Sequence, residues 1–262
     1  PFGLERLLWM VNRNIIFDID DSIYIPDREE GGLTGWLKRR IKKKEVVSIL
    51  RISKCVIVEN THIKNFVKKY CNKIHIIAGP IDTVRNYPKK YCDNSDEITI
   101  GWIGSPSTTS YLNMLDETLW QLSRNYGIKV RLIGASSYSM DGVKLEIVDW
   151  SQETEVSELH KFDIGIMPMP DNEWTRGKVG CKMLQYMANA IPAVVSYTPT
   201  NAEVIEDNIN GFLAGSDKEW IEKLSVLIER PDIRERVGLN GRDRIEKGYS
   251  LKINGPRFKE VL

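Results

Sequence analysis

The sequence predicts an α/β protein with two doubly wound parallel-sheet domains, the first of them incomplete. Short apolar strands alternate with helical segments along the chain, and this alternation stops and restarts around residues 88–97. The chain has 262 residues, which is enough for two such domains. Its 42% hydrophobic content excludes a disordered chain, and its apolar runs are too short to cross a membrane.

The first part of the chain alternates strands and helices in the order that builds a parallel sheet. Its expected elements are a strand at 14–21 that runs into acidic residues, a helix at about 33–53, a strand at 55–59, a helix opened by Asn60 and Thr61, and a strand at 74–78. A β-α-β-α-β order requires crossover helices, and crossovers join parallel strands. The chain begins at Pro1 without a signal-like segment, so we expect a piece of a longer protein.

The segment between Pro88 and Glu97 is polar and rich in turn-forming residues, and it lacks any hydrophobic period. We therefore expect the linker there. The predicted divisions are a partial first domain at 1–95, a second domain at 96–248, and a C-terminal helix at 249–262 that packs back on the first domain.

The second part of the chain repeats the alternation through six short strands. These are expected at 98–103, 129–133, 145–148, 164–167, 193–196 and 211–214, with helices at 107–126, 153–160, 178–190, 201–206, 217–229 and 231–247. Six apolar strands alternating with helices predict a doubly wound sheet.

The net charge of +1 conceals two parts of opposite sign, because residues 1–95 carry +7 and the remainder −6. Six cations fill seven positions from Lys38 to Lys44, beside Trp36, Leu37 and Ile41. Such a helix suits the surface of an anionic membrane, which would place a cytoplasmic protein at its inner face. A solvated helix face is the alternative. Nucleic acid is not an expected partner, because no recognition motif or interleaved aromatic residues accompany the charge.

The four cysteines and three histidines are scattered and form no metal-binding pattern. A structural zinc site or a disulfide framework is therefore not expected, and reduced thiols are.

Ligands of open parallel sheets bind where strands end and helices begin, because free N–H groups gather there. The loop Gly104–Thr109 follows a strand, so Gly104 and Ser105 are candidates for phosphate contacts, although a capped turn would have the same residues. The segment Arg176–Lys182 brings Lys178 and Lys182 to a predicted helix start, where cations cost stability unless an anion meets them.

A third loop, Thr198–Val204, enters a helix after a strand. Asn201 and Glu203 in this loop are candidate ligand contacts. The alternative is purely local, since Asn is a common N-cap and an acidic residue in the first turn stabilises the helix dipole.

Several spaced motifs resemble those of family-4 glycosyltransferases. They occur in the family's order over residues 98–250, on the matching strand and helix pattern: 101–109 (GWIGSPSTT), 148–150 (VDW), 163–168 (DIGIMP), 177–188 (GKVGCKMLQYMA), 191–196 (IPAVVS), 201–205 (NAEVI), 210–213 (NGFL) and 249–250 (YS). Residues 14–82 resemble the later part of the family's N-terminal domain through 18–24 (DIDDSIY) and 56–60 (VIVEN).

This resemblance implies a GT-B-like fold of two Rossmann-like domains, with residues 1–95 forming only part of the first. It also implies a retaining enzyme that moves a sugar from a nucleotide-sugar donor to a cell-surface glycan or lipid-linked acceptor. No cofactor or metal is then expected, because fixed cations and a helix N-terminus can stabilise the leaving diphosphate.

The resemblance also implies roles for individual residues. Lys182, followed by Lys178, would be catalytic by stabilising the leaving group. The expected donor contacts are the backbone of Gly104 and Ser105, the indole of Trp150 beside the base, and Gly180, Gln185, Asn201 and Glu203.

One motif departs from the family, which usually has two glutamates eight positions apart. Here Gly177 and Gln185 occupy these positions. Gln185 can still hydrogen-bond a ribose diol, but without a charge. Asp171 or Glu173 could supply the missing carboxylate.

Two other functions remain open from the sequence. The missing glutamates favour a sugar-nucleotide-binding module that has lost turnover. Asp18 and Asp20 follow the pattern in which carboxylates hold Mg²⁺ in phosphatases, or manganese in transferases of another fold, although Ser22-Ile-Tyr24 replaces the small residues and Thr of the phosphatases. The alternative is that Asp18 and Asp20 are carboxylates hydrogen-bonded at a domain interface, which would give the same sequence pattern.

Overall fold

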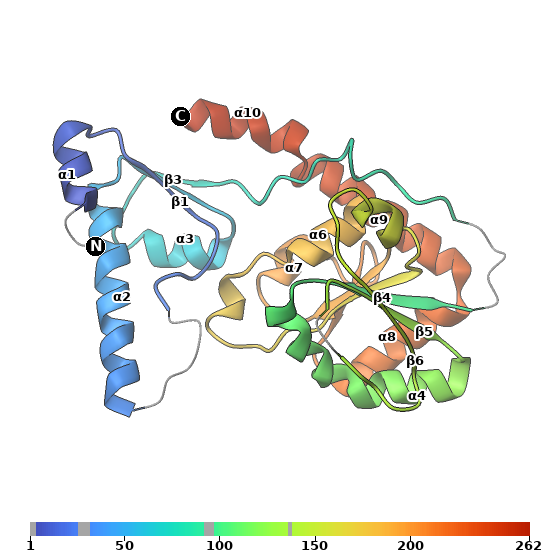
Figure 1. The fold of residues 1–262 in the computed structure, drawn as a ribbon. Helices are drawn as coiled ribbons and strands as arrows, with labels where there is room; N and C mark the ends of the chain where they lie inside the picture. The colour runs from blue at the N-terminus through green and yellow to red at the C-terminus, as the bar shows by residue number, and fades with distance from the viewer. Residues whose placement is uncertain (1–3, 26–31, 92–96, 136–137) are drawn as a thin grey trace. The chain divides into compact units, whose positions relative to one another are not determined.

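The computed structural model describes residues 4–25, 32–91, 97–135 and 138–262, and they divide into two compact units (Figure 1). Unit 1 contains Pro1–Pro80, Asp171–Val179 and Asn254–Leu262, and unit 2 contains Ile81–Pro170 and Gly180–Ile253. The chain therefore passes from one unit to the other four times. The predicted boundary at 95/96 lies outside the described residues, and the first crossing comes earlier, at Pro80/Ile81.

Unit 1 contains a parallel sheet of three strands in the order β1-β2-β3. Its elements are α1 (Leu4–Val11), β1 (Ile16–Ile19), α2 (Gly32–Ile52), β2 (Cys55–Val58), α3 (Thr61–Val67), β3 (Ile74–Ile76) and most of α10 (Leu251–Val261). The predicted β-α-β-α-β order and the helical tail are confirmed. Asn60 caps α3 as expected, since its side chain accepts the Ile63 N–H at 2.9 Å. The helix α1 was not predicted.

The first strand is shorter than predicted. It ends at Ile19, so that Asp18 lies within the strand and is exposed, rather than following it. The strand is also less buried than its apolar residues suggest, because Ile16 and Phe17 are half-buried and Ile19 alone among its residues is buried.

Unit 2 contains a six-stranded sheet in the order β6-β5-β4-β7-β8-β9, with every pairing parallel. The strands are β4 (Thr99–Ile103), β5 (Lys129–Ile133), β6 (Lys144–Val148), β7 (Ile164–Met167), β8 (Ala193–Ser196) and β9 (Phe212–Ala214). This is the doubly wound order, in which strands are added outward on one side of β4 and then, from β7 on, outward on its other side, so that the reversal point of the strand order lies between β4 and β7. All six predicted strands and the α/β class are confirmed.

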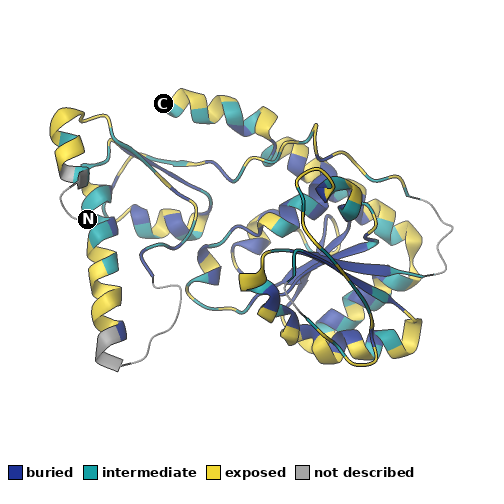
Figure 2. Cartoon of the chain, in the orientation of Figure 1, coloured by how far each residue is buried: buried dark blue, intermediate teal, exposed yellow. Residues whose placement is uncertain are grey.

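Helices enclose this sheet, and most strand residues are buried (Figure 2). The helical elements are η1 (Pro106–Leu115), α4 (Asp116–Tyr126), α5 (Glu155–Leu159), α6 (Cys181–Ala188), α7 (Asn201–Val204), α8 (Asp217–Glu229) and α9 (Pro231–Gly248). The core of fully buried side chains includes Trp102, Leu119 and Leu224. Within the described ranges, the helices include none that is long and apolar enough to cross a membrane.

The reversal point between β4 and β7 is held open by a buried tyrosine. The two strands pair only at Ile100–Ile164 and Gly101–Gly165. Beyond these pairs, the Tyr186 hydroxyl accepts the Ile103 N–H and donates to the Ile166 carbonyl, each at 3.1 Å. A Cβ on Gly165 would lie 2.5 Å from the Tyr186 ring, so glycine makes room for it. The tyrosine thus replaces ladder hydrogen bonds that the separating strands no longer make.

The segment 81–91 belongs to unit 2, and its last residues, from Pro88 on, are the described part of the predicted linker at 88–97. Arg242 of α9 is buried, and it donates to the backbone carbonyls of Thr83, Asn86 and Ala188. Lys89 additionally pairs with Asp163. Lys89, a polar residue of the predicted linker, thus helps to attach this segment to unit 2.

Candidate donor site in unit 2

The predicted donor residues of unit 2 gather at the carboxyl ends of its parallel strands. Gly104 and Ser105 follow β4, Trp150 follows β6, Gly180 and Lys182 lie between β7 and the first turn of α6, and Asn201 follows β8. Ligands of open parallel sheets bind at this edge, and above all at the reversal point. Here that point lies between β4 and β7, so the loop after β4 and the start of α6 flank it.

Lys182 lies beside Gly104 at the reversal point. Its ammonium is 5.2 Å from the centre of the Trp102 ring and 3.4 Å from the Thr108 hydroxyl. A Cβ on Gly104 would lie 2.6 Å from Lys182 Cε and 2.5 Å from the Trp102 ring. Only glycine therefore leaves the path of the lysine side chain clear. The cation is partly buried, which strengthens its interaction with any anion that binds there.

Gly134 lies between Trp150 and the loop that follows β4, and its lack of a side chain lets the two come close. This glycine follows β5 with a φ of 71°, and a Cβ on it would lie 2.5 Å from the Gly104 carbonyl oxygen and 3.1 Å from Trp150 Cβ. The indole N–H of Trp150 donates to Glu155 at 2.6 Å, and the residue is 52% exposed. The loops after β4, β5 and β6 therefore form one continuous surface that ends in an exposed aromatic ring.

On the other side of the reversal point, Asn201 faces Gly180. The side-chain amide of Asn201 donates to the Ser196 carbonyl at 2.8 Å and is fully buried. Its Oδ1 has no hydrogen-bond partner among the described residues, and it would lie 3.4 Å from a Cβ on Gly180. A buried acceptor without a donor is costly, so this oxygen is a strong candidate to receive a ligand hydroxyl.

The remaining predicted residues are less closely grouped. Glu203 is exposed, and its backbone carbonyl accepts from Arg244 at 2.8 Å. Gln185 is partly buried in the second turn of α6; within the described ranges, no hydrogen bond joins its side chain to another predicted residue. Ser105 is exposed and its hydroxyl is 2.9 Å from that of Ser107.

Lys178 does not lie where the sequence predicted. The helix α6 begins at Cys181 rather than at residue 178, and Lys178 has an extended backbone and belongs to unit 1. There its ammonium lies 3.3 Å from Asp21 and 5.0 Å from the centre of the Trp174 ring. The expectation of two lysines one turn apart on the same helix is therefore wrong.

Lys178 lies next to a concentration of carboxylates in unit 1. Burial and the neighbouring charges of Asp20, Asp18 and Asp21 raise the pKa of Glu59 to about 7. Partial desolvation of the carboxyl group and the charge of Asp20 also raise the pKa of Asp18. Among the described residues, no group of three or more histidine, cysteine or acidic side chains has the geometry to hold a metal ion. The pattern at Asp18 and Asp20 thus gains no third ligand from the fold.

The carboxylates expected to substitute for the missing glutamates have other partners. Asp171 forms a two-pronged ion pair with Arg176, at 2.6 and 2.8 Å, and Glu173 pairs with Arg39 of α2. Both belong to unit 1. Gly177 lies against Ser22, and a Cβ on Gly177 would overlap the Ser22 hydroxyl.

Several site residues were not identified from the sequence, namely Trp102, Thr108, Gly134 and Tyr186. Each could have been suspected from its position: Trp102 and Gly134 lie at the carboxyl ends of predicted strands, and Thr108 belongs to a candidate loop. Tyr186 gave no such signal, because its role depends on the gap between β4 and β7.

Two parallel-sheet units, one of them with a reversal-point site, are typical of the GT-B class of glycosyltransferases, and solved structures of this class match the chain. Sucrose-phosphate synthase from Thermosynechococcus elongatus superposes with a TM-score of 0.76 at 12% identity, covering 98% of this chain and 70% of that one. HepE from Anabaena, in complex with UDP, gives 0.76 at 12% identity, covering 98% and 74%.

A TarM variant from S. aureus, in complex with fondaparinux, α-GlcNAc-glycerol and UDP, gives a TM-score of 0.72 at 16% identity. The match covers 95% of this chain but 50% of the TarM chain. At these identities the structures establish the fold. No curated protein matches the chain.

The family model of the glycosyl transferases group 1 matches residues 97–230, which is just over half of the chain. The chain therefore belongs to the glycosyl transferases group 1. The matched residues run from the start of β4 to the end of α8 and include every predicted donor residue of unit 2.

Proposed function

We propose that this chain transfers a sugar from a nucleotide-sugar donor to an acceptor, with retention of the anomeric configuration, and that unit 2 binds the donor. The observation that carries the proposal is the Lys182 ammonium, held beside Gly104 and the Trp102 ring at the reversal point of the sheet. Breaking a sugar–diphosphate bond develops negative charge on the leaving group. A cation fixed in a partly buried site stabilises that charge without reorganising during the reaction.

The other residues of the site suit the remaining parts of a nucleotide-sugar. The exposed indole of Trp150 offers a face for the base, and the backbone of Gly104 and Ser105 is open to the phosphates. The orphaned Oδ1 of Asn201 can accept a hydrogen bond from a sugar hydroxyl. HepE has been solved with UDP-glucose and the TarM variant with UDP, so UDP-glucose is the first donor to test.

We also propose that the reaction needs no metal and that Lys182 takes the place a cation would occupy. We keep Lys178 as a second candidate for stabilising the leaving group. Because its ammonium is paired with Asp21 in unit 1, this role requires that ion pair to open. The proposed acceptor is a cell-surface glycan or a lipid-linked sugar, reached at the cytoplasmic face of a membrane.

A second candidate function is a sugar-nucleotide-binding module without turnover. Gly177 favours it, because that position has no space for the glutamate that the family usually has, and Gln185 replaces the second glutamate. Both candidates predict donor binding, and only the first predicts transfer.

The test is a thermal-shift panel of UDP-, GDP-, ADP- and CMP-sugars, with and without EDTA, followed by a transfer assay. A ligand at a hundred times its Kd stabilises the folded state by about 2.7 kcal/mol, which is readily measured. A shift for one base that EDTA does not change, with turnover, supports the enzyme. A shift without turnover on any glycan supports the binding module. No shift with any nucleotide would contradict both, and NMR of the product anomer tests retention.

A further inference from the structure

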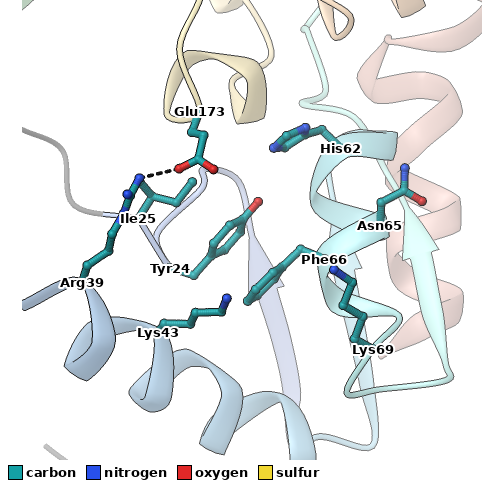
Figure 3. A pocket seen from close by; sticks show the side chains of 9 residues that line it. All are labelled: Tyr24, Ile25, Arg39, Lys43, His62, Asn65, Phe66, Lys69 and Glu173. Atoms are coloured by element: carbon teal, nitrogen blue, oxygen red, sulfur yellow. Dashed lines mark hydrogen bonds and ion pairs between the residues drawn. The ribbon is translucent and has the colours of Figure 1, made fainter. Parts of the chain in front are cut away.

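Unit 1 contains a cavity that the donor site does not use. Its volume is about 480 Å³, within the range of small-molecule sites. Residues from the β1–α2 connection, from α2, from α3 and from the segment 171–179 line it (Figure 3). Because all of these belong to unit 1, the cavity is defined without reference to unit 2.

Three basic side chains reach this cavity, from α2 and from the turn after α3. Arg39 and Lys43 come from α2, and Lys69 follows α3. Arg39 forms an ion pair with Glu173 at one side (Figure 3). Neither Lys43 nor Lys69 has an ion-pair partner among the described residues. With one acidic residue in the lining, the cavity has an excess of positive charge, and a concave wall concentrates the field of such charges.

Two stacked aromatic rings form another part of the wall. The rings of Tyr24 and Phe66 lie 3.6 Å apart with 10° between their planes, and the Lys43 ammonium is 5.8 Å from the centre of the Phe66 ring. The Tyr24 hydroxyl points toward the side where Glu173 and His62 lie (Figure 3). It accepts a hydrogen bond from the Ser22 hydroxyl at 3.3 Å, so its own proton is available to a ligand.

These features together select a particular ligand chemistry. Cations in a small cavity select an anion of high charge density, and aromatic walls with a hydroxyl and the Asn65 amide nearby select a ring that bears hydroxyls. A sugar that carries a phosphate ester has both parts. A neutral sugar leaves the lysines without a counter-ion, and inorganic phosphate leaves the aromatic wall uncovered.

We propose that this cavity binds the phosphate-bearing sugar of the acceptor, which rests on the proposed transferase function. The shared chemistry is a phosphate ester next to a sugar ring. It can come from a soluble sugar phosphate or from a sugar linked through phosphate to a membrane lipid. Arg39 is kept at the edge of the cavity by Glu173, so that Lys43 and Lys69 meet the phosphate first.

The test is calorimetric titration of the full chain with glucose 1-phosphate, with UDP present at saturation so that the donor site is occupied. Lys43→Ala and Lys69→Ala should each weaken binding about tenfold or more, in line with the loss of one charge-assisted hydrogen bond. Lys44→Ala is the matched control, because it removes the same charge from the next position of α2 and Lys44 does not line the cavity. Glucose should bind far more weakly than glucose 1-phosphate in every variant.

Glu173→Gln is expected to change the affinity for glucose 1-phosphate in the opposite direction from the lysine variants. It removes the one carboxylate among the described lining residues and releases Arg39, so glucose 1-phosphate should bind several-fold more tightly. A merely structural role of Glu173 would not produce a gain in affinity. Raising the salt concentration should weaken the wild-type complex and reduce the differences between variants.

The source of the phosphate is distinguished by competition with phosphatidylcholine vesicles that contain polyprenyl phosphate, against phosphatidylcholine vesicles that carry the same surface charge in the form of phosphatidylglycerol. Displacement of glucose 1-phosphate by the first vesicles only assigns a lipid-linked ligand, and no displacement assigns a soluble one.

The proposal is overturned if glucose 1-phosphate does not bind while UDP does, or if Lys43→Ala and Lys44→Ala behave alike. Glucose 1-phosphate that binds through Lys43 in a protein that binds no nucleotide would instead contradict the transferase function. UDP binding should be the same in all the cavity variants, which confirms that unit 2 is intact.

Discussion

At the scale of single residues, Lys182 is the side chain on which the proposed chemistry depends. It lies in the first turn of α6, where the helix dipole disfavours a cation. The Trp102 ring and the Thr108 hydroxyl hold the ammonium in this unfavourable place. A cation kept where it destabilises a helix is well suited to a site where an anion binds.

Lys182→Ala is expected to reduce kcat about a hundredfold, the usual cost of removing one donor that stabilises a developing negative charge. The nucleotide thermal shift should persist, though reduced, because the contacts of Trp150 and Gly104 remain. Lys218→Ala, an exposed lysine of α8, is the control and should leave kcat unchanged. Full activity of Lys182→Ala would remove this residue from the mechanism.

Glu59 predicts a pH dependence of stability. Its pKa of about 7 in the folded protein is above the ordinary value of 4.5, so the folded state holds the proton more tightly than the unfolded state. The stability from this group is fully present below pH 4.5 and is lost as the pH rises through about 7. Glu59→Gln keeps the neutral form at every pH.

We therefore expect the melting temperature of Glu59→Gln relative to wild type to increase between pH 5 and pH 8. Glu260→Gln, which neutralises an exposed carboxylate of α10, should show no such increase. A difference between Glu59→Gln and wild type that is constant with pH would contradict the raised pKa.

Individual contacts were the least predictable part of the site. The sequence identified Lys182, Gly104 and Asn201 because each lies near the end of a strand. It misplaced Lys178, because an apolar period does not show where a helix begins. The residues Val179 and Gly180 could equally belong to a helix or to the extended crossing between units.

At the scale of elements, α2 combines a long basic surface with exposed apolar side chains. Trp36, Leu37 and Ile41 are 54%, 51% and 44% exposed; the first two directly precede the six cations of residues 38–44, and Ile41 lies among them. Large apolar side chains on a basic helix surface can enter the headgroup region of a membrane, while the cations meet anionic lipid.

We expect the protein to sediment with vesicles that contain anionic lipid and not with neutral vesicles. The double variant Leu37→Ser, Ile41→Ser should reduce the bound fraction strongly without changing the charge. Leu239→Ser, at an exposed apolar position of α9, is the control and should bind like wild type. Equal binding of both variants would assign the surface of α2 to solvent.

Local side-chain chemistry explains the main error in the predicted helices. Residues 107–126 were expected to form one helix, but 3₁₀ turns occupy Pro106–Leu115 and the α-helix begins at Asp116. The hydroxyls of Thr108 and Thr109 bond to the Ser105 carbonyl, at 3.1 and 3.5 Å. Such bonds compete with the first α-helical turn, and a hydrophobic period does not register them.

At the scale of the whole molecule, the order of strands in the sheet of unit 2 could be predicted from the sequence, but the boundaries of the two units could not. Alternating strands and helices with right-handed crossovers leave few possible topologies, so the doubly wound sheet was predictable. The first crossing at residue 80 was not, because the contacts of Arg242 with segment 81–91 link residues more than 150 positions apart.

Arg242→Ala is expected to destabilise unit 2 by about 3 kcal/mol, because it leaves backbone carbonyls of a buried region without donors. Segment 81–91 should also become more sensitive to proteolysis. Arg230→Ala removes only an exposed ion pair with Asp232 and should change stability by less than about 1 kcal/mol. Chemical denaturation of the three proteins measures both values, and equal stabilities would contradict the role of Arg242.

The discontinuous composition of unit 1 bears on how the protein is made. The ribosome releases residues 1–80 first, yet these need 171–179 and then 254–262 to be complete. Trp174, which packs on the core of unit 1, arrives only after much of unit 2 has been synthesised. Domains that are continuous in sequence fold in the order of their synthesis. Residues 1–80 therefore emerge well before the segments that complete unit 1, so the nascent chain must keep these strands from aggregating until residues 254–262 have been synthesised.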